Sequence, residues 1–229
     1  MLSENLAAVE ERVYEACRRA GRDRSEVTLI AVSKTHPVSD IREIMACGVK
    51  DFGENKVQEM TGKIEEIPEP LNWHLIGHLQ RNKVKYIVDK ACLIHSVDSL
   101  RLAQEIEKEA EKKDVQSDIL IEINIGGEET KSGIAKGEAV QLICDIAPLE
   151  RVHIKGLMAI VPPVDDPEDA RGYFKEMKAI FEEVKAMEIP GVEMKELSMG
   201  MTGDFEVAIE EGATMVRVGT AIFGARSYA

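Results

Sequence analysis

Short apolar runs alternate with longer amphipathic segments along most of this chain. Eight runs rich in valine, isoleucine and leucine predict β-strands at residues 27–34, 51–54, 72–77, 92–97, 118–125, 152–160, 195–199 and 214–222. Between them, apolar positions at helical spacing predict helices, most clearly at residues 99–113, 136–146, 167–187 and 203–212. A further amphipathic helix over residues 3–20 precedes the first strand and carries one apolar face, formed by Leu6, Val9, Val13 and Ala16.

Strands that alternate with helices predict a parallel sheet, because each helix returns the chain to begin the next strand in the same direction. Eight such units fit a closed α/β barrel of the (β/α)8 TIM type. An open, doubly wound sheet is the alternative, but no G-x-G-x-x-G follows the first strand and the glycine-bearing strand ends are spread over several strands. The sequence ends seven residues after Ile222, so we expect the N-terminal helix to occupy the place of an eighth outer helix.

The composition is that of one folded domain covering residues 1–229. Hydrophobic residues make up 44% and charged residues 31%, which is enough apolar material for a large core, and no linker-like segment divides the chain. A net charge of -13 argues against a nucleic-acid partner, which needs clustered lysine and arginine. The N-terminus lacks a signal-peptide pattern and no apolar run approaches membrane-spanning length. We therefore expect a cytoplasmic protein with no membrane partner, and a monomer because the barrel can close alone.

Several familiar chemistries find no support in the sequence. The four cysteines are scattered without a C-x-x-C pair, which predicts buried thiols rather than disulfides: Cys17, Cys47, Cys92 and Cys144. His74 and His78 are four residues apart but flank a strand-like segment, whereas metal-binding histidines at that spacing need a helix, so no metal site is expected. No G-x-S-x-G nucleophile motif occurs.

Lys34 closes the apolar first strand and is the first candidate for chemistry. Burial lowers the pKa of a lysine toward that of a neutral amine, which attacks carbonyl groups and forms a Schiff base. The simpler interpretation is that Lys34 marks the exit of the strand into solvent. The remaining strand ends decide between the two, because working residues of a βα barrel lie at the C-terminal ends of its strands.

The last two strand ends together predict a phosphate site. Residues 198–204 present hydroxyls and small side chains just before a helix, where backbone N–H groups are unsatisfied. The eighth strand contains Arg217 and is followed by Gly219 and Thr220, and barrels commonly hold phosphate in the loops after strands seven and eight. An amine for a Schiff base, a phosphate cradle and an intervening arginine suggest pyridoxal 5'-phosphate as the cofactor.

Motifs in the same order along the chain carry a family resemblance: AVSKT at 31–35, FGENKVQE at 52–59, WHLIGHLQ at 73–80, HSVD at 95–98, KSGI at 131–134, GLM at 156–158, LSMGM at 197–201 and VRVGTAIFG at 216–224. With them, the chain resembles the pyridoxal phosphate homeostasis protein family over nearly its whole length. These are barrel proteins of fold type III, related in fold to the N-terminal domain of alanine racemase.

The resemblance implies a role for each candidate residue. Lys34 would form the internal aldimine with the cofactor aldehyde, Asn55 would lie beside the ring, and Arg217 would face the pyridine nitrogen. The phosphate would be held by side chains and backbone of the last two strand ends: Ser198, Met199, Gly200, Met201, Thr202, Gly219 and Thr220. A guanidinium keeps its protons, so Arg217 would leave the ring nitrogen neutral and the cofactor a weaker electron sink.

The resemblance further implies a protein without catalysis of its own, which carries or buffers pyridoxal phosphate and affects amino-acid and keto-acid balance. Pyridoxal-phosphate-dependent apoenzymes are the implied partners. Racemases of related fold take a second acid–base residue from a separate C-terminal domain, and because this sequence ends with the barrel we expect a site open to water.

Two other functions remain open. A small fold type III racemase would use a tyrosine, histidine or cysteine near the barrel mouth as its second base, with His74 and His78 as candidates. A phosphosugar-binding barrel would instead use Lys34 for a sugar imine. Lys131, in the loop after the fifth strand, is a candidate for a second, weaker cofactor site.

Overall fold

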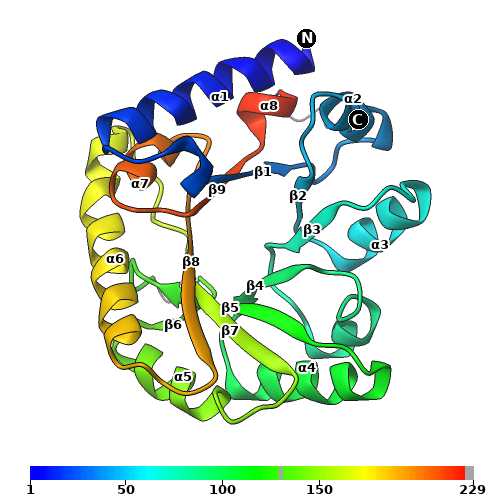
Figure 1. Ribbon diagram of the computed structural model, residues 1–229, viewed down its shortest axis with the longest axis vertical. Coiled ribbons are helices and arrows are strands. Elements are labelled where there is room, and N and C mark those ends of the chain that lie inside the picture. The colour runs from blue at the N-terminus through cyan, green and yellow to red at the C-terminus, as the bar shows by residue number, and fades with distance from the viewer. Residues whose placement is uncertain (129–130, 225–229) are drawn as a thin grey trace.

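Eight parallel strands form a closed barrel in the computed structural model, which describes residues 1–128 and 131–224 (Figure 1). The strands follow one another round the barrel in chain order, and pairing between β4 and β5 closes it. A ninth strand of two residues, β6, lies beside β5 outside this ring. Within the described residues the strands are β1 Thr28–Val32, β2 Asp51–Glu54, β3 Asn72–Leu75, β4 Leu93–Val97, β5 Ser117–Asn124, β6 Ile134–Ala135, β7 Val152–Ala159, β8 Val192–Met201 and β9 Met215–Val218. The predicted barrel is confirmed.

The last strand is shorter than the sequence predicted. β9 ends at Val218, and residues 220–222, which continue its apolar run, belong to a short helix, α8 (Thr220–Phe223). The backbone N–H groups of Ile222 and Phe223 donate to the carbonyl oxygen of Gly219, and both side chains are buried. The amide of Asn5 donates to the Ile222 carbonyl at 3.0 Å. This run is apolar because it packs beneath the N-terminal helix, not because it continues the sheet.

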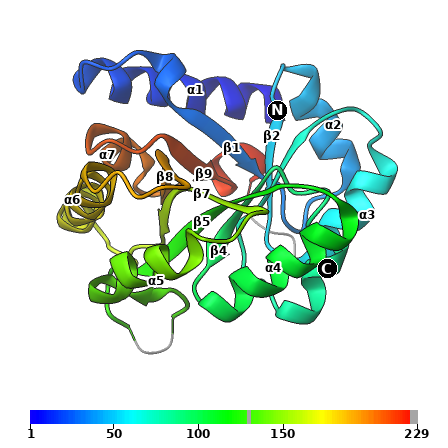
Figure 2. The ribbon, with the colours of Figure 1, turned by 60° about the horizontal axis from the view of Figure 1, so that its bottom comes forward.

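Helices surround the barrel on its outer face (Figures 1 and 2). In the described ranges the remaining α-helices are α1 Leu2–Arg19, α2 Val38–Ala46, α3 Val57–Glu66, α4 Leu100–Lys113, α5 Ala139–Ile146, α6 Arg171–Ala186 and α7 Phe205–Glu210. Single 3-10 segments are η1 Arg24–Glu26, η2 Arg81–Tyr86, η3 Lys136–Glu138 and η4 Pro167–Ala170. The predicted helices at 136–146 and 167–187 therefore each begin with a 3-10 turn, and the one at 203–212 is shortened to α7.

The N-terminal helix closes the outer ring, as the sequence predicted. In both views α1 lies alongside α7, and Figure 1 shows it between α7 and α2 (Figures 1 and 2). Its inner face is buried, and its outer edge is tied to α7 by ion pairs from Arg12 to Glu206 and from Arg19 to Glu210, both at 2.7 Å. These contacts hold α1 beside α7 in the outer ring, in the position that an eighth outer helix would occupy.

The cysteines differ from the expectation that all four are buried. Cys17 is buried on the inner face of α1, but Cys47, Cys92 and Cys144 are exposed, and all four are free thiols. Cys47 lies at the C-terminal cap of α2 and Cys92 precedes β4, so both lie at the ends of elements, whereas Cys144 lies within α5. Across residues 1–128 and 131–224, no helix combines the length and the apolar character required to cross a lipid bilayer.

Candidate functional site

A cavity of about 430 Å³ lies at the C-terminal ends of the barrel strands. It brings together most of the residues that the sequence singled out, from β1, β2, β8 and β9. Those predicted residues are Lys34, Asn55, Met201, Thr202, Arg217, Gly219 and Thr220. Its other lining residues are Val32, Ile76, Gly77, His78, Glu122, Ser132, Ile160 and Gly203. Amine, guanidinium, hydroxyl and carboxyl groups thus share one space.

Lys34 lies in a tight turn directly after β1 and is half-buried. The next residue, Thr35, adopts a left-handed backbone conformation with φ 67°, which is unusual for a residue other than glycine. Its backbone N–H donates to the Glu59 carboxylate, and the His36 N–H donates to the Ser33 carbonyl at 3.0 Å. These bonds hold the turn in a conformation that the chain would not favour by itself.

A buried ion-pair group holds this turn in place; it consists of Lys63, Glu54 and Glu59. The Lys63 ammonium donates to the Ser33 carbonyl at 2.8 Å and to one oxygen each of Glu54 and Glu59 at 2.7 Å. Glu54 is fully buried and also accepts from the Ser33 hydroxyl at 2.6 Å, while its second oxygen has no hydrogen-bond partner among the described residues. Burial raises the pKa of Glu54, although Lys63 and Ser33 oppose this. Lys63 therefore holds both a buried carboxylate and the backbone beside Lys34.

Arg217 is the buried cation of the site. It is 4% exposed and donates to the hydroxyl of Ser198 and, at 2.9 Å, to the carbonyl of Ala159. Burial lowers the pKa of its guanidinium to about 10, while the carboxyl groups of Asp204 and Glu122 oppose the change. The group therefore remains charged at neutral pH and offers only hydrogen-bond donors to the cavity.

Three residues expected at the phosphate lie below the cavity. Ser198, Met199 and Gly200 are buried and are absent from its lining, and the Ser198 hydroxyl lies between Arg217 and His95. Ser198 of β8 pairs with Met215 of β9, and Met201 pairs with Arg217. Three residue steps along β8 therefore correspond to two along β9. This irregularity in the ladder changes which β8 residues reach the mouth.

The loops after β8 and β9 meet at one end of the cavity. The Gly219 N–H donates to the Thr202 hydroxyl at 3.3 Å, and the Met201 N–H donates to Asp204 Oδ1 at 2.6 Å. At Gly219 an added Cβ would lie 3.3 Å from the Val32 carbonyl oxygen, whereas Gly203 faces open space. Backbone and hydroxyl groups are thus presented without covering side chains, which suits a phosphate.

Asn55 owes its position to a close approach between neighbouring strand ends. A Cβ on Gly77 would lie 2.4 Å from the Asn55 carbonyl oxygen, so only glycine allows the two segments to pack here. The Gly77 carbonyl in turn accepts from the Ser96 hydroxyl at 2.7 Å. The WHLIGHLQ motif therefore includes a glycine with a structural purpose.

Sequence reasoning did not assign Glu122 to the site. It is 3% exposed, and one carboxylate oxygen accepts from the Ser132 hydroxyl at 3.0 Å; within residues 1–128 and 131–224 the other oxygen has no hydrogen-bond partner. Burial raises the pKa of Glu122. A charged residue inside an otherwise apolar strand was the signal that could have identified it, since the same signal identified Arg217.

The two candidate histidines lie in different places. His78 lines the cavity beside Lys34, whereas His74 is buried and lines a separate cavity near the N-terminal ends of the strands. Of these two histidines, His78 is therefore the one placed to act as a base at this mouth. Lys131 forms an ion pair with Glu128 at 2.8 Å and does not line the cavity.

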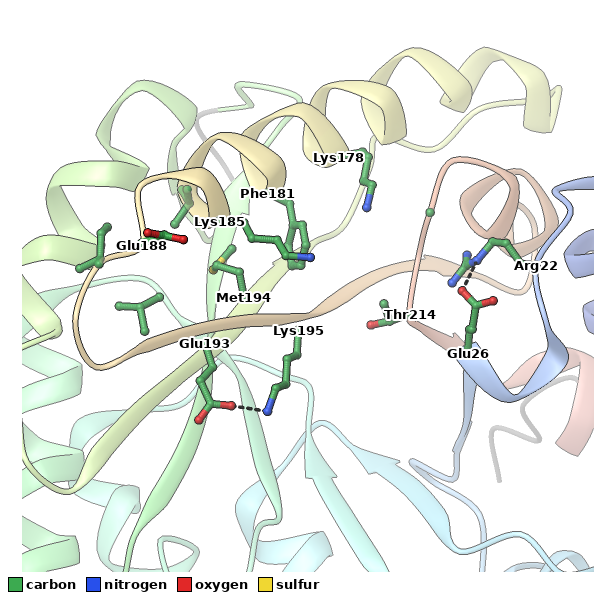
Figure 3. Close-up of a pocket in the computed structure, with 14 residues that line it drawn as sticks. Arg22, Glu26, Lys178, Phe181, Lys185, Glu188, Glu193, Met194, Lys195 and Thr214 are labelled. Atoms are coloured by element: carbon green, nitrogen blue, oxygen red, sulfur yellow. Dashed lines mark hydrogen bonds and ion pairs between the residues drawn. The ribbon is translucent and has the colours of Figure 1, made fainter.

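The structure also contains a larger groove, of about 1000 Å³, between α6 and the first half of β8 (Figure 3). Its charged side chains include pairs with each other, Arg22 with Glu26 at 3.4 Å and Lys195 with Glu193 at 2.5 Å (Figure 3). It contains neither Lys34 nor the two glycine-bearing loops. Size alone therefore does not identify the site, and the chemistry favours the smaller cavity.

The closed barrel and the lysine at the end of its first strand define a protein of the alanine racemase N-terminal domain class. The family model described as "Alanine racemase, N-terminal domain" matches residues 5–227. An alanine racemase structure from Clostridium difficile, 16% identical, superposes with a TM-score of 0.74 over 98% of this chain and 56% of its own, which concerns the fold alone.

Sequence relatives narrow this class to one family. The pyridoxal phosphate homeostasis protein of Aquifex aeolicus is 47% identical over 226 residues, covering 98% of both chains. That of Escherichia coli is 40% identical over 231 residues, covering 99% of this chain and 97% of its own. PipY of Synechococcus elongatus, solved with pyridoxal phosphate bound, is 34% identical with a TM-score of 0.85 and covers 98% of this chain and 100% of its own. The chain belongs to the pyridoxal phosphate homeostasis protein family.

Proposed function

We propose that this protein binds pyridoxal phosphate in the strand-end cavity and carries or buffers it, without catalysing a reaction of its own. One observation carries the proposal: an amine, a buried guanidinium and two loops of glycine and hydroxyl residues line the same cavity. These are Lys34, Arg217, Thr202, Gly203, Gly219 and Thr220. The names of the two homeostasis relatives and the bound cofactor in PipY support the choice of ligand.

The donor set fits each part of the cofactor. When bound, pyridoxal phosphate supplies an aldehyde that bonds reversibly to amines, and we assign Lys34 as that amine. Thr202, Gly203, Gly219 and Thr220 would hold the phosphate through hydroxyl and backbone donors. We assign Ser198 to the support of Arg217 rather than to the phosphate, because its hydroxyl is engaged below the cavity.

Arg217 favours storage over catalysis. A guanidinium donates hydrogen bonds but retains its protons, so it would leave the pyridine nitrogen neutral and limit the withdrawal of electrons from a bound amino acid. We propose that the protein maintains amino-acid and keto-acid balance in the cytoplasm by supplying the cofactor to pyridoxal-phosphate-dependent apoenzymes.

A catalytic function is the second candidate, and one observation favours it. His78 and Glu122 both line the cavity, and either could exchange a proton with a ligand there. The racemase hypothesis therefore rests on His78 rather than His74, which the fold holds away from this mouth.

The proposal is tested by titrating purified protein with pyridoxal phosphate and then adding a panel of L-amino acids. We expect saturable binding, seen as a new absorbance band, and displacement of the cofactor by amines without any racemised or transaminated product detected by chiral chromatography. Formation of a D-amino acid or a keto acid at a rate that requires His78 would replace the carrier hypothesis with an enzyme. No saturable binding would reject both.

Replacing Thr220 with alanine is expected to weaken pyridoxal phosphate binding about tenfold or more. A hydrogen bond to a charged group contributes roughly 1.5–3 kcal/mol, and Thr220 lies at the end of the cavity that we assign to the phosphate. Equilibrium titration measures the dissociation constant. Thr61→Ala is the matched control, because the Thr61 hydroxyl donates only within its own helix, to the Gln58 carbonyl at 3.1 Å. Equal affinities for the two variants would remove Thr220 from the phosphate site.

A further inference from the structure

A continuous line of hydrogen bonds crosses the barrel interior. Arg217 donates to Ser198 Oγ, which lies 3.0 Å from His95 Nδ1. His95 Nε2 lies 3.0 Å from His74 Nδ1, and His74 Nε2 lies 3.1 Å from Asp51 Oδ1. Ser198 and His95 are 0% exposed and His74 is 3% exposed. Five strands, β9, β8, β4, β3 and β2, each supply one member.

The line joins cavities at opposite ends of the barrel. Arg217 lines the strand-end cavity. Asp51 and His74 line a second cavity of about 350 Å³, which we call the lower cavity and which is formed largely by residues at the beginnings of strands. Asp51 is 27% exposed there, so solvent reaches this end of the line. The proposed binding of pyridoxal phosphate in the strand-end cavity involves none of these three residues: His74, His95 and Asp51.

Hydrogen-bonding capacity gives the line a single direction when both histidines are neutral. A guanidinium only donates, so Ser198 Oγ accepts a hydrogen bond from Arg217, and the Ser198 hydroxyl donates one to His95 Nδ1. His95 then carries its proton on Nε2 and donates to His74 Nδ1, and His74 donates from Nε2. Burial alone would raise the pKa of Asp51, but hydrogen bonds from His74 and Asn72 outweigh it and lower that pKa. Asp51 is therefore a carboxylate, which only accepts.

We propose that Ser198, His95 and His74 are positioning residues for Arg217, and that they couple its hydrogen bonding to the protonation state of the lower cavity. For its effect on the cofactor, the inference rests on the proposed function. The hydrogen-bond line itself does not depend on that function, because it consists of this chain's own residues.

One added proton reverses part of the line. A proton taken up by His74 occupies Nδ1, the nitrogen that faces His95, because Nε2 already carries the hydrogen donated to Asp51, and His74 then donates from both nitrogens. His95 must accept on Nε2 and carry its own proton on Nδ1, where it donates to Ser198 Oγ. The Ser198 hydroxyl can then no longer donate to His95, and Ser198 Oγ accepts hydrogen bonds from both His95 and Arg217. His95 itself resists charging, because burial, with His74 and Arg217 nearby, holds its pKa well below 6.5.

Several charged groups surround His74 in the lower cavity. Titratable and charged groups of the lower cavity come from the surrounding strands: Asp51 from β2, Cys92 before β4, Asp118 from β5, Lys155 from β7, and Glu193, Lys195 and Glu196 from β8. His95 adjoins His74 on the inner side. Among these groups, Asp51 is the one that accepts a hydrogen bond from His74.

The experiment is a pH titration of the histidine side chains by 15N NMR on the full chain, first without cofactor. Of the five histidines, the signals of His74 and His95 are assigned with His74→Gln and His95→Gln variants. At pH 8 we expect both rings as Nε2–H tautomers. As the pH falls, His74 should become doubly protonated while His95 changes to the Nδ1–H tautomer at the same midpoint. With pyridoxal phosphate added, the absorbance maximum of the bound cofactor should shift at that midpoint too.

Asp51→Asn should change the 15N chemical shift of His74 Nε2, because it replaces the carboxylate that accepts a hydrogen bond from that nitrogen. Asp118→Asn is the matched control: Asp118 lines the same cavity but lies 3.4 Å from His153 instead of joining the line. An Nδ1–H tautomer of His95 at pH 8, or equal shifts in the two variants, would overturn the hydrogen-bond line. Correct tautomers with no change in the cofactor spectrum would overturn the coupling to Arg217. Failure to bind cofactor would reject the proposed function while the cofactor-free titration still tested the line.

Discussion

Replacing Lys34 with alanine is expected to abolish the absorbance band above about 400 nm that pyridoxal phosphate should develop in this protein. Lys34 is the lysine that lines the strand-end cavity, and the turn that holds it is fixed by Glu59 and Lys63. Without its amine the cofactor aldehyde has no partner in the cavity, although the loops after β8 and β9 would still bind the phosphate. We therefore expect the variant to retain weaker, non-covalent binding.

Two measurements check this result. Absorbance titration follows the band, and borohydride reduction followed by peptide mass spectrometry identifies the modified lysine. Lys56→Ala is the matched control, because Lys56 is an exposed lysine at the next strand end, just before α3, and does not line the cavity. A band that survives in Lys34→Ala, or a modified peptide without Lys34, would show that another lysine carries the cofactor.

Replacing Lys63 with methionine is expected to lower the free energy of unfolding by about 3–5 kcal/mol, the usual cost of removing one partner from a buried ion pair. The Lys63 ammonium lies 2.7 Å from Glu54, and the two side chains are 8% and 0% exposed. Methionine preserves much of the packing but leaves the Glu54 carboxylate buried without its cation. The Ser33 carbonyl also loses a donor, so the turn carrying Lys34 should loosen as well.

The pH dependence separates this electrostatic cost from a packing defect. Burial already raises the pKa of Glu54 above its ordinary value of 4.5, and the loss of Lys63 should raise it further. The folded variant then binds more protons than the unfolded chain, so its stability increases as the pH falls toward 4.5. The deficit relative to the wild type should therefore be largest at neutral pH and smaller at pH 5.5.

Chemical denaturation at the two pH values, without added cofactor, measures this deficit. Lys108→Met is the control, because Lys108 forms an exposed pair with Glu105 at 3.1 Å and is 57% exposed, so about 0.5 kcal/mol or less is expected. The double variant Lys63→Met with Glu54→Gln should recover part of the loss, since it removes the unpaired carboxylate. A deficit that is equal at both pH values would point to packing instead.

The barrel could be predicted because its strands are buried on both faces. Parallel strands of this kind are continuous apolar runs, so their number and order are visible in the sequence, and a polar residue within or just after such a run stands out. Lys34 and Arg217 were identified in this way, and the cavity brings both together. Apolar positions at helical spacing likewise predicted the N-terminal helix and its buried face.

The position of Ser198 could not be predicted from the pattern of apolar and polar residues. Its position one layer below the cavity follows from the irregular pairing of β8 with β9, where residues 198 and 201 face Met215 and Arg217. Side chains alternate across a strand, so one extra residue in the ladder exchanges inward and outward positions beyond it. Nothing in the sequence LSMGM locates that extra residue.

Local sequence patterns were enough to predict the class of fold, a lysine and an arginine for the candidate site, and two loops suited to a phosphate, because each depends on residues close together in the chain. Which side chains contact one another across the barrel depends on the tertiary structure. The pairing of Lys63 with Glu54 and the line from Arg217 to Asp51 join different elements, and their geometry depends on register and closure. Local patterns of polarity carry no information about such contacts, because the same alternation of apolar and polar residues is compatible with several registers.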